Sequence, residues 1–281
     1  MWLCRAESSR ARVITLLAHP AIQGGAAPLV VALVVAAIFA RTRFAWLALL
    51  GAYATMVALT TGFAMTPLTV ARKTILVGLI VPFIGLALDL MPRASKSLVP
   101  FVVVAAGAVS VWIFLSILRQ RDWIPAIATA AGVALFVAVL VGLTLRIRGD
   151  GLRGGAAALG LGLATGIAGL LAASIGYLLA GVSIAAGGGA LLLTQVLLSR
   201  QLVPGFLGML TCGLLTALFA AGSMLLAELP WYVLPLLLLV PLAVTLRAPD
   251  RAPFIVRAAV LAGYALIAAA VPILAAWFAP R

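Results

Sequence analysis

Long apolar runs separated by short charged segments make up almost the whole chain. A helix that crosses a bilayer needs about 20 largely apolar residues, and cutting the sequence at its charged clusters gives a series of runs near that length. They cover residues 22–40, 44–64, 73–91, 98–118, 123–145, 154–174, 176–198, 203–226, 230–246 and 254–278. The pattern predicts an all-α, polytopic membrane helix bundle with about ten transmembrane helices.

The amino-acid composition agrees with a membrane protein. Of the 281 residues, 65% are hydrophobic and 9% are charged, whereas soluble domains have about 45–50% apolar and about 25% charged residues. So few polar side chains cannot cover a water-soluble globule, but a bilayer requires an apolar exterior. The net charge of +13 comes from Lys and Arg scattered between the runs, where they meet lipid headgroups. We therefore expect the lipid bilayer, and not nucleic acid, as the partner.

Few side chains in this sequence could carry out catalysis or hold a metal. His19 is the only histidine, and Cys4 and Cys212 are far apart in the chain, so one chain cannot form a Cys/His cluster of metal-site spacing. Residues 149–154 match the pattern G-x-G-x-x-G. A connection between two adjacent spans has no room for the strand–turn–helix unit that this motif requires. We expect no cofactor, no metal and no catalytic residue.

Two halves of the chain share a pattern at an offset of 128 residues. Arg-x-x-Asp-x-x-Pro occurs at Arg119–Pro125 and again at Arg247–Pro253. This suggests a basic interfacial segment, residues 1–21, followed by two five-helix units, residues 22–148 and 149–281. Because five is odd, tandem units would enter the membrane in opposite directions, as in the inverted repeats of many secondary transporters. The pattern alone leaves open whether the duplication is real.

Helix breakers and hydroxyl groups inside the apolar runs are candidates for a substrate cavity. Irregular backbone at membrane depth occurs only where protein or a water-filled cavity satisfies it. The candidates are Thr60, Thr61, Pro82, Gly187, Gly188, Gly189, Thr194 and Gln195, with Tyr53 or Tyr177 as hydrogen-bonding caps. Small residues also let membrane helices pack closely, and Gly162-x-x-x-Gly166 predicts one such contact. The sequence does not choose between the two interpretations for the cavity candidates.

A second set of candidates consists of charged residues at the ends of runs. They are Asp89, Arg119, Asp122, Arg247 and Asp250. Such residues anchor helices at headgroup depth, but the planar fork of Arg also suits a phosphate or another anionic group.

These observations favour a carrier or permease for a neutral or amphipathic solute, with a cavity between the two halves. The alternative is a non-catalytic membrane subunit or scaffold, packed against a partner subunit or as a homodimer, which predicts a filled bundle. A lipid-modifying enzyme using Arg119, Arg121 and Asp122 is a third hypothesis.

We expect a bacterial cytoplasmic membrane as the location of the protein, since no organellar targeting signal stands out. The basic residues of the second half favour termini outside the cytoplasm.

Overall fold

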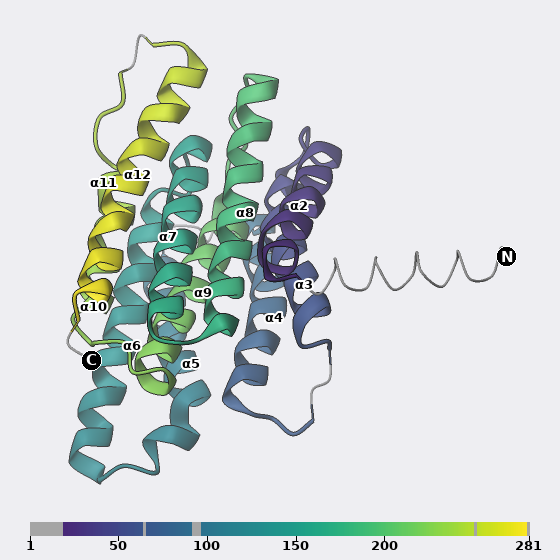
Figure 1. Ribbon diagram of the computed structural model, residues 1–281. Helices are drawn as coiled ribbons and strands as arrows, with labels where there is room; N and C mark the ends of the chain where they lie inside the picture. Colours follow the sequence, from purple (N-terminus) through teal and green to yellow (C-terminus); the bar gives the residue numbers. More distant parts are fainter. Residues whose placement is uncertain (1–18, 64–65, 92–96, 250–251, 280–281) are drawn as a thin grey trace, which may run out of the picture.

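The computed structural model in Figure 1 describes residues 19–63, 66–91, 97–249 and 252–279, and these contain helices and no strand. The long helices are α4 (Val70–Leu90), α5 (Val99–Leu118), α6 (Trp123–Arg146), α7 (Gly151–Leu171), α8 (Ile175–Leu198), α9 (Gly205–Leu226) and α12 (Phe254–Trp277). The shorter ones are η1 (Ile22–Ala26), α2 (Ala27–Ile38), η2 (Arg43–Trp46), α3 (Leu47–Thr60), α10 (Val233–Leu237) and α11 (Leu239–Ala243). The predicted all-α class is confirmed.

In the described part of the chain, eight helices are long and apolar enough to cross a membrane, which is compatible with a multi-pass integral membrane protein. Each predicted run contains helix, but the first and ninth give only the shorter segments Ile22–Ile38 and Val233–Ala243. The predicted count of about ten is therefore not confirmed. In the ninth run, Pro241 accounts for the break between Leu237 and Leu239, because it has no N–H to donate one turn back to the Leu237 carbonyl.

Two predicted features fall partly or wholly outside the described residues. Of the basic segment 1–21, only residues 19–21 are described, and His19 is exposed there. Asp250 is also outside the described part. The interfacial role of both stays a prediction.

If η1–α2, η2–α3 and α10–α11 are each taken as one segment, consecutive segments run in opposite directions, so their ends lie at two opposite faces of the bundle (Figure 1). One face carries the end of α3, the start of α4, the connections α5–α6, α7–α8 and α9–α10 and the end of α12. We call it the open face, because the cavity described below opens there. The other face carries the connections α2–α3, α6–α7 and α8–α9, the end of α4, the starts of α5 and α12 and the end of α11, and we call it the clamped face.

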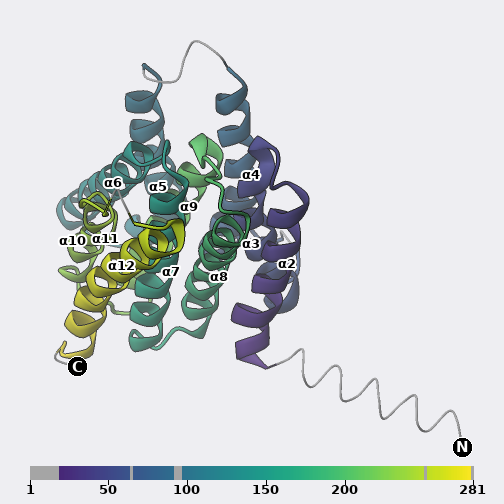
Figure 2. The same ribbon diagram turned by 90° about the horizontal axis from the view of Figure 1, so that it is seen from above.

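Helix α9 lies inside the bundle, whereas α2 and α12 lie at its edge (Figure 2). Every residue from Phe206 to Ser223 is buried, and α9 packs against α3, α4, α5, α6, α7 and α8. A helix that is apolar all round is buried on all sides. The helices around α9 pack on it with one side and present large apolar side chains outward on the other, as α5 does with Phe101 and Val104.

The closest helix pair is α7 and α8, and glycines make this approach possible. A Cβ atom on Gly162 would lie 2.7 Å from the carbonyl oxygen of Gly181 and 2.9 Å from the Cα of Ala185. A Cβ on Gly181 would meet the backbone of Gly166. Small residues at such spacing let two helix backbones approach each other in a membrane. The close contact predicted from Gly162 and Gly166 is therefore confirmed, with its partner helix in the same chain.

The two predicted five-helix units differ in their packing. In the second unit, its first helix α7 packs along its last helix α12, whereas the corresponding pair α2 and α6 makes no comparable contact in the described part. Helix α2 packs on α8, but the counterpart pair α7 and α3 likewise lacks such a contact between described residues. The inverted repeat is not confirmed, and the division at residue 148 stays a prediction.

At the clamped face, Asp89 of α4 caps the N-terminus of α9. Its Oδ1 accepts a hydrogen bond from the N–H of Phe206 (2.8 Å), and its Oδ2 accepts one from the N–H of Leu207 (2.9 Å). Gly205 turns the chain into α9 with φ +61°, and a Cβ there would collide with the Asp89 carboxylate. The carboxylate thus satisfies two free amides and faces the positive end of the helix dipole.

Gln195 and Trp46 hold the α8–α9 connection at the same face. The Gln195 Nε2 donates to the carbonyls of Gly151 (3.1 Å) and Leu191 (3.3 Å), while its Oε1 accepts from the Leu202 N–H (3.1 Å). The Trp46 Nε1 donates to the Leu202 carbonyl (2.7 Å). We call these hydrogen bonds, with those of Asp89, the clamp.

Replacing Gly181 with alanine should destabilise the α7–α8 contact. The added Cβ meets the Gly166 backbone, and overpacking of this kind costs about 1–3 kcal/mol. We expect a lower midpoint of thermal unfolding in detergent. The control is Gly263→Ala in α12, where a Cβ meets nothing within 4 Å, so its midpoint should stay unchanged or rise. Equal midpoints for both variants would contradict the packing role of Gly181.

Asp89→Ala should destabilise the protein by about 1–2 kcal/mol, the usual effect of removing a helix cap. The measurement is again thermal unfolding in detergent. Asp122→Ala is the matched control, because Asp122 precedes α6 but its side chain makes no capping hydrogen bond. If the two variants unfold at the same temperature, Asp89 does not stabilise α9.

Candidate functional site

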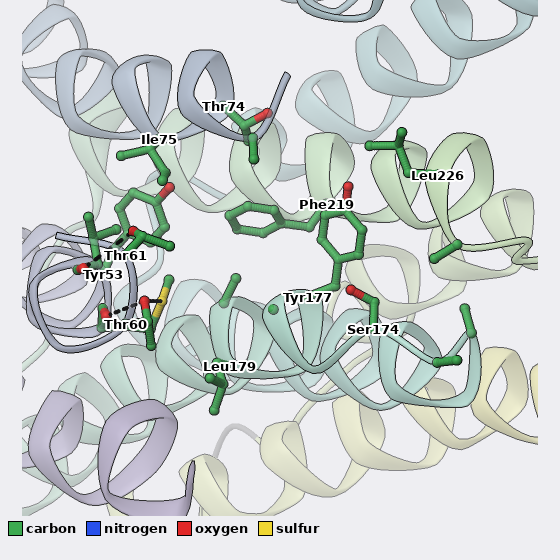
Figure 3. A pocket seen from close by; sticks show the side chains of 18 of the residues that line it. Tyr53, Thr60, Thr61, Thr74, Ile75, Ser174, Tyr177, Leu179, Phe219 and Leu226 are labelled. Carbon is green, nitrogen blue, oxygen red and sulfur yellow. Dashed lines mark hydrogen bonds between the residues drawn. The ribbon is translucent and has the colours of Figure 1, made fainter. Parts of the chain in front are cut away.

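A cavity of about 630 Å³ opens at the open face between α3, α4, α8 and α9 (Figure 3). Its polar lining consists of Tyr53, Thr60, Thr61, Thr74, Ser174, Tyr177 and Glu228. The remaining lining is apolar and includes Ile75, Leu179, Phe219 and Leu226. A concave, mostly apolar space with a few polar groups is the usual form of a small-molecule site.

Three aromatic rings form the inner wall of the cavity. Phe219 of α9 lies between Tyr53 of α3 and Tyr177 of α8 (Figure 3). Its ring centroid is 6.0 Å from that of Tyr53 and 6.3 Å from that of Tyr177. Both tyrosine rings are tilted against Phe219, an arrangement that aromatic pairs favour. The cavity therefore offers apolar ring surface to a bound solute.

Glycines of neighbouring helices fix the positions of the two tyrosines. A Cβ on Gly78 of α4 would lie 2.5 Å from the Cε1 of Tyr53. A Cβ on Gly222 of α9 would lie 2.5 Å from the hydroxyl oxygen of Tyr177, and one on Gly169 of α7 would lie 2.7 Å from its Cβ. Each ring thus occupies space that a larger residue on the facing helix would take.

The tyrosine hydroxyls have unused hydrogen-bonding capacity. The Tyr53 hydroxyl is buried and has no partner among the described residues. A buried hydroxyl without a partner costs about 1–3 kcal/mol. The hydroxyl has almost no exposed surface, so a solute reaches it only when a neighbouring helix shifts, and a hydrogen bond formed then would be favourable. Glycine at position 78 leaves no side-chain group on that part of α4 to compete for the hydroxyl.

The threonine hydroxyls of the cavity donate within their own helices. Thr60 donates to the Met56 carbonyl (2.8 Å), and Thr74 donates to the Val70 carbonyl (3.0 Å). Thr61 makes a longer bond of 3.4 Å one turn back. With their hydrogens directed at these carbonyls, the hydroxyl oxygens keep lone pairs with which they can accept hydrogen bonds from a solute.

Glu228 is the only ionisable residue besides the tyrosines among the described residues that line the cavity. It lies just after α9, is exposed, and has a left-handed backbone with φ +58°. The lining contains no Lys, Arg or His in this described set. The cavity therefore has no group to neutralise an anionic solute, whereas neutral and amphipathic solutes meet hydroxyls and rings.

The predicted cavity candidates separate into two groups. Thr60 and Thr61 line the cavity, as do both predicted caps, Tyr53 and Tyr177. The others lie elsewhere in the bundle: Pro82, Gly187, Gly188, Gly189, Thr194 and Gln195.

Two of these other candidates, Gly187 and Gly188, take part in close helix packing, and Gln195 belongs to the clamp. A Cβ on Gly187 would lie 2.8 Å from a methyl carbon of Leu49 in α3, and one on Gly188 would lie 2.8 Å from the Cβ of Ala158 in α7. Thr194 donates back to the Ala190 carbonyl (2.8 Å). For Gly187 and Gly188, close helix packing is thus the interpretation that fits the structure.

The interfacial charges do not form one site. Asp89 belongs to the clamp. Arg119 and Asp122 are exposed at the open face, and Arg247 is exposed at the clamped face. None of these three forms an ion pair in the described part of the chain, whereas Arg153 pairs with Asp150 there at 3.4 Å.

Phe219 and Thr74 of the cavity were not candidates from the sequence. Phe219 is followed by the small residues Ala220, Ala221 and Gly222 of α9. A single large ring beside such small residues could have indicated a side chain that faces a cavity. Thr74 carries no such signal, because a single threonine near the start of an apolar run is common.

A second hollow of about 800 Å³ lies between α6, the end of α9 and α10. Its lining is mostly apolar and includes Leu135 and Trp231, which are strongly exposed. In a bilayer such an outward-facing groove is filled by lipid chains, so the cavity between α3, α4, α8 and α9 is the stronger candidate.

Comparison of the chain with protein-family models, with curated proteins and with solved structures gives no match. The arrangement of its own residues is therefore what indicates the function.

Proposed function

We propose that the protein is a carrier for small neutral or amphipathic solutes. The observation that supports this function is the asymmetry of the bundle: one face opens into a cavity of about 630 Å³, and the opposite face is closed by the clamp. Carriers work by alternating exposure of a site between two sides of the membrane. An open cavity on one side and a closed connection on the other is the form expected of one such state.

The clamp suits a closure that must open in each cycle. In the clamp, Asp89 and Gln195 accept hydrogen bonds from N–H groups at the start of α9 and in the α8–α9 connection, and Trp46 donates one to that connection. The bonds of Gln195 and Trp46 are buried, and once water enters, each can be exchanged for a bond to water at a net cost of about 0.5–1.5 kcal/mol. The bonds to the charged Asp89 carboxylate cost about 1.5–3 kcal/mol each. Movement of α8 and α9 at this face would then expose the cavity from the other side.

The lining supports the solute class. Tyr53, Phe219 and Tyr177 provide ring surface, and Thr60 and Thr61 provide acceptors. A solute with an apolar body and one hydroxyl or carbonyl group would match this lining, because its polar group can pair while its body is buried.

The basic residues support an orientation of the carrier in a bacterial cytoplasmic membrane. In the described part, the clamped face carries Arg41, Arg43, Arg146, Arg148, Arg153, Arg200, Arg247 and Arg257, and the open face carries Arg72, Lys73, Arg119 and Arg121. Loops rich in Lys and Arg stay in the cytoplasm. The clamped face is then cytoplasmic, and the cavity opens away from the cytoplasm.

Cysteine labelling tests the two faces. In a variant without Cys4 and Cys212, we expect a membrane-impermeant maleimide on intact cells to label Gln120→Cys and Ala227→Cys at the open face. Gly149→Cys and Gln201→Cys at the clamped face should react with the maleimide only after the cells are permeabilised. Thr61→Cys at the cavity should behave like Ala227→Cys, and Leu210→Cys, buried inside α9, should not react. Labelling of all four connection positions from one side would contradict the arrangement.

Tyr53→Phe should lower solute uptake by proteoliposomes about two- to tenfold, since one neutral hydrogen bond contributes about 0.5–1.5 kcal/mol. The assay uses a panel of neutral and amphipathic solutes, each with and without a hydroxyl or carbonyl group. Thermal stability should not fall, because the Tyr53 hydroxyl has no described protein partner.

Tyr264→Phe is the control for this variant, because Tyr264 lies on α12 away from the cavity lining. Uptake should be unchanged in it. If the unaltered protein transports no solute of the panel and instead co-purifies with a membrane partner subunit, the alternative function as a non-catalytic subunit or scaffold replaces this proposal.

A further inference from the structure

A third hollow of about 570 Å³ lies at the clamped face, away from the cavity. Three arginines line it. Arg41 lies in the α2–α3 connection, Arg43 is the first residue of η2, and Arg200 lies in the α8–α9 connection. Asp89 and Gly205 complete its inner part. The tertiary structure thus brings together basic residues that are more than 150 positions apart in the sequence.

The positive charge of this hollow is not balanced by the residues that line it. Asp89 is the one carboxylate in the lining, and both of its oxygens already accept hydrogen bonds from the amides of α9. Arg41, Arg43 and Arg200 are exposed and have no ion-pair partner among the described residues. Three guanidinium groups against one engaged carboxylate leave the hollow cationic.

The position and geometry of these groups suit a phosphate. Arginine presents its N–H donors as a planar fork, which matches the oxygens of a phosphate in two parallel hydrogen bonds. The hollow lies where the helices end, at the depth of lipid headgroups, and basic pockets at this depth bind anionic headgroups. Asp89 does not compete for the arginines, because its charge faces the N-terminus of α9.

We propose that this hollow binds a phosphate-bearing anion through Arg41, Arg43 and Arg200. The bound anion links the α2–α3 connection to the α8–α9 connection, next to the hydrogen bonds of the clamp. The same chemistry is present in an anionic phospholipid headgroup and in a free phosphate compound. Binding does not depend on carrier activity, so its test is independent of the proposed function.

The test measures thermal unfolding of the full chain in detergent with increasing phosphatidylglycerol, with phosphatidylcholine as the zwitterionic comparison. A parallel series adds inorganic phosphate, matched in ionic strength by chloride. We expect one of the two phosphate probes to raise the unfolding midpoint in a saturable way. A rise with phosphatidylglycerol alone identifies a lipid headgroup, and a rise with inorganic phosphate identifies a soluble phosphate compound.

The decisive comparison is between two double variants. Arg41→Gln with Arg200→Gln should weaken the binding of that probe by about tenfold or more, since each lost contact involves a charged group. Arg146→Gln with Arg247→Gln removes the same charge from exposed positions of the same face outside the hollow, and should change binding less than about threefold. If the glutamine pair fails to fold, Arg41→Lys with Arg200→Lys keeps the charge and loses the fork, and binding should again weaken.

Two results would overturn the proposal. The first is the absence of a midpoint shift with either phosphate probe. The second is an equal loss of binding in both double variants, which would mean that the net charge of the face attracts anions without a site in the hollow.

Discussion

Close packing of small residues is the constraint on which this bundle depends. Between helices in lipid, burial of apolar surface gives little driving force, because the acyl chains are as apolar as the side chains that they would replace. Association then relies on contact distance. Gly162, Gly166 and Gly181 let the α7 and α8 backbones meet, and α9 packs on all sides with small residues such as Gly208 and Gly213 against its neighbours. The larger side chains of α5 and α12 are left for the outside.

The buried position of α9 connects the two ends of the molecule. At the clamped face its first amides are held by Asp89 of α4, and toward the open face its Phe219 forms the inner wall of the cavity with Tyr53 and Tyr177. A movement of α9 relative to α4 would therefore change both the clamp and the cavity. This mechanical link is the physical basis for proposing alternating exposure, and the cationic hollow shares Asp89 and Gly205 with the clamped end of α9.

Sequence patterns predicted the helices well and their roles less well. Each apolar run contains a helix in the described part of the chain, since length and hydropathy are local properties, but two of the runs hold only shorter segments. The small-residue spacing at Gly162 and Gly166 also indicated a true contact. The run of three glycines from Gly187 appeared equally suited to a cavity, but two of them contact Leu49 and Ala158 of other helices. A glycine looks the same in a sequence whether a ligand or another helix fills the space beside it.

By itself, the sequence determined the class of the molecule: an all-helical chain whose apolar runs are compatible with several membrane crossings. It also restricted the chemistry, because one histidine and two distant cysteines leave few ways to build a metal site. Only the tertiary structure decided that α9 is central, that Asp89 caps it, and that Arg41 and Arg200 share a hollow. These relations join residues far apart in the chain, and hydropathy contains no information about which helix lies beside which.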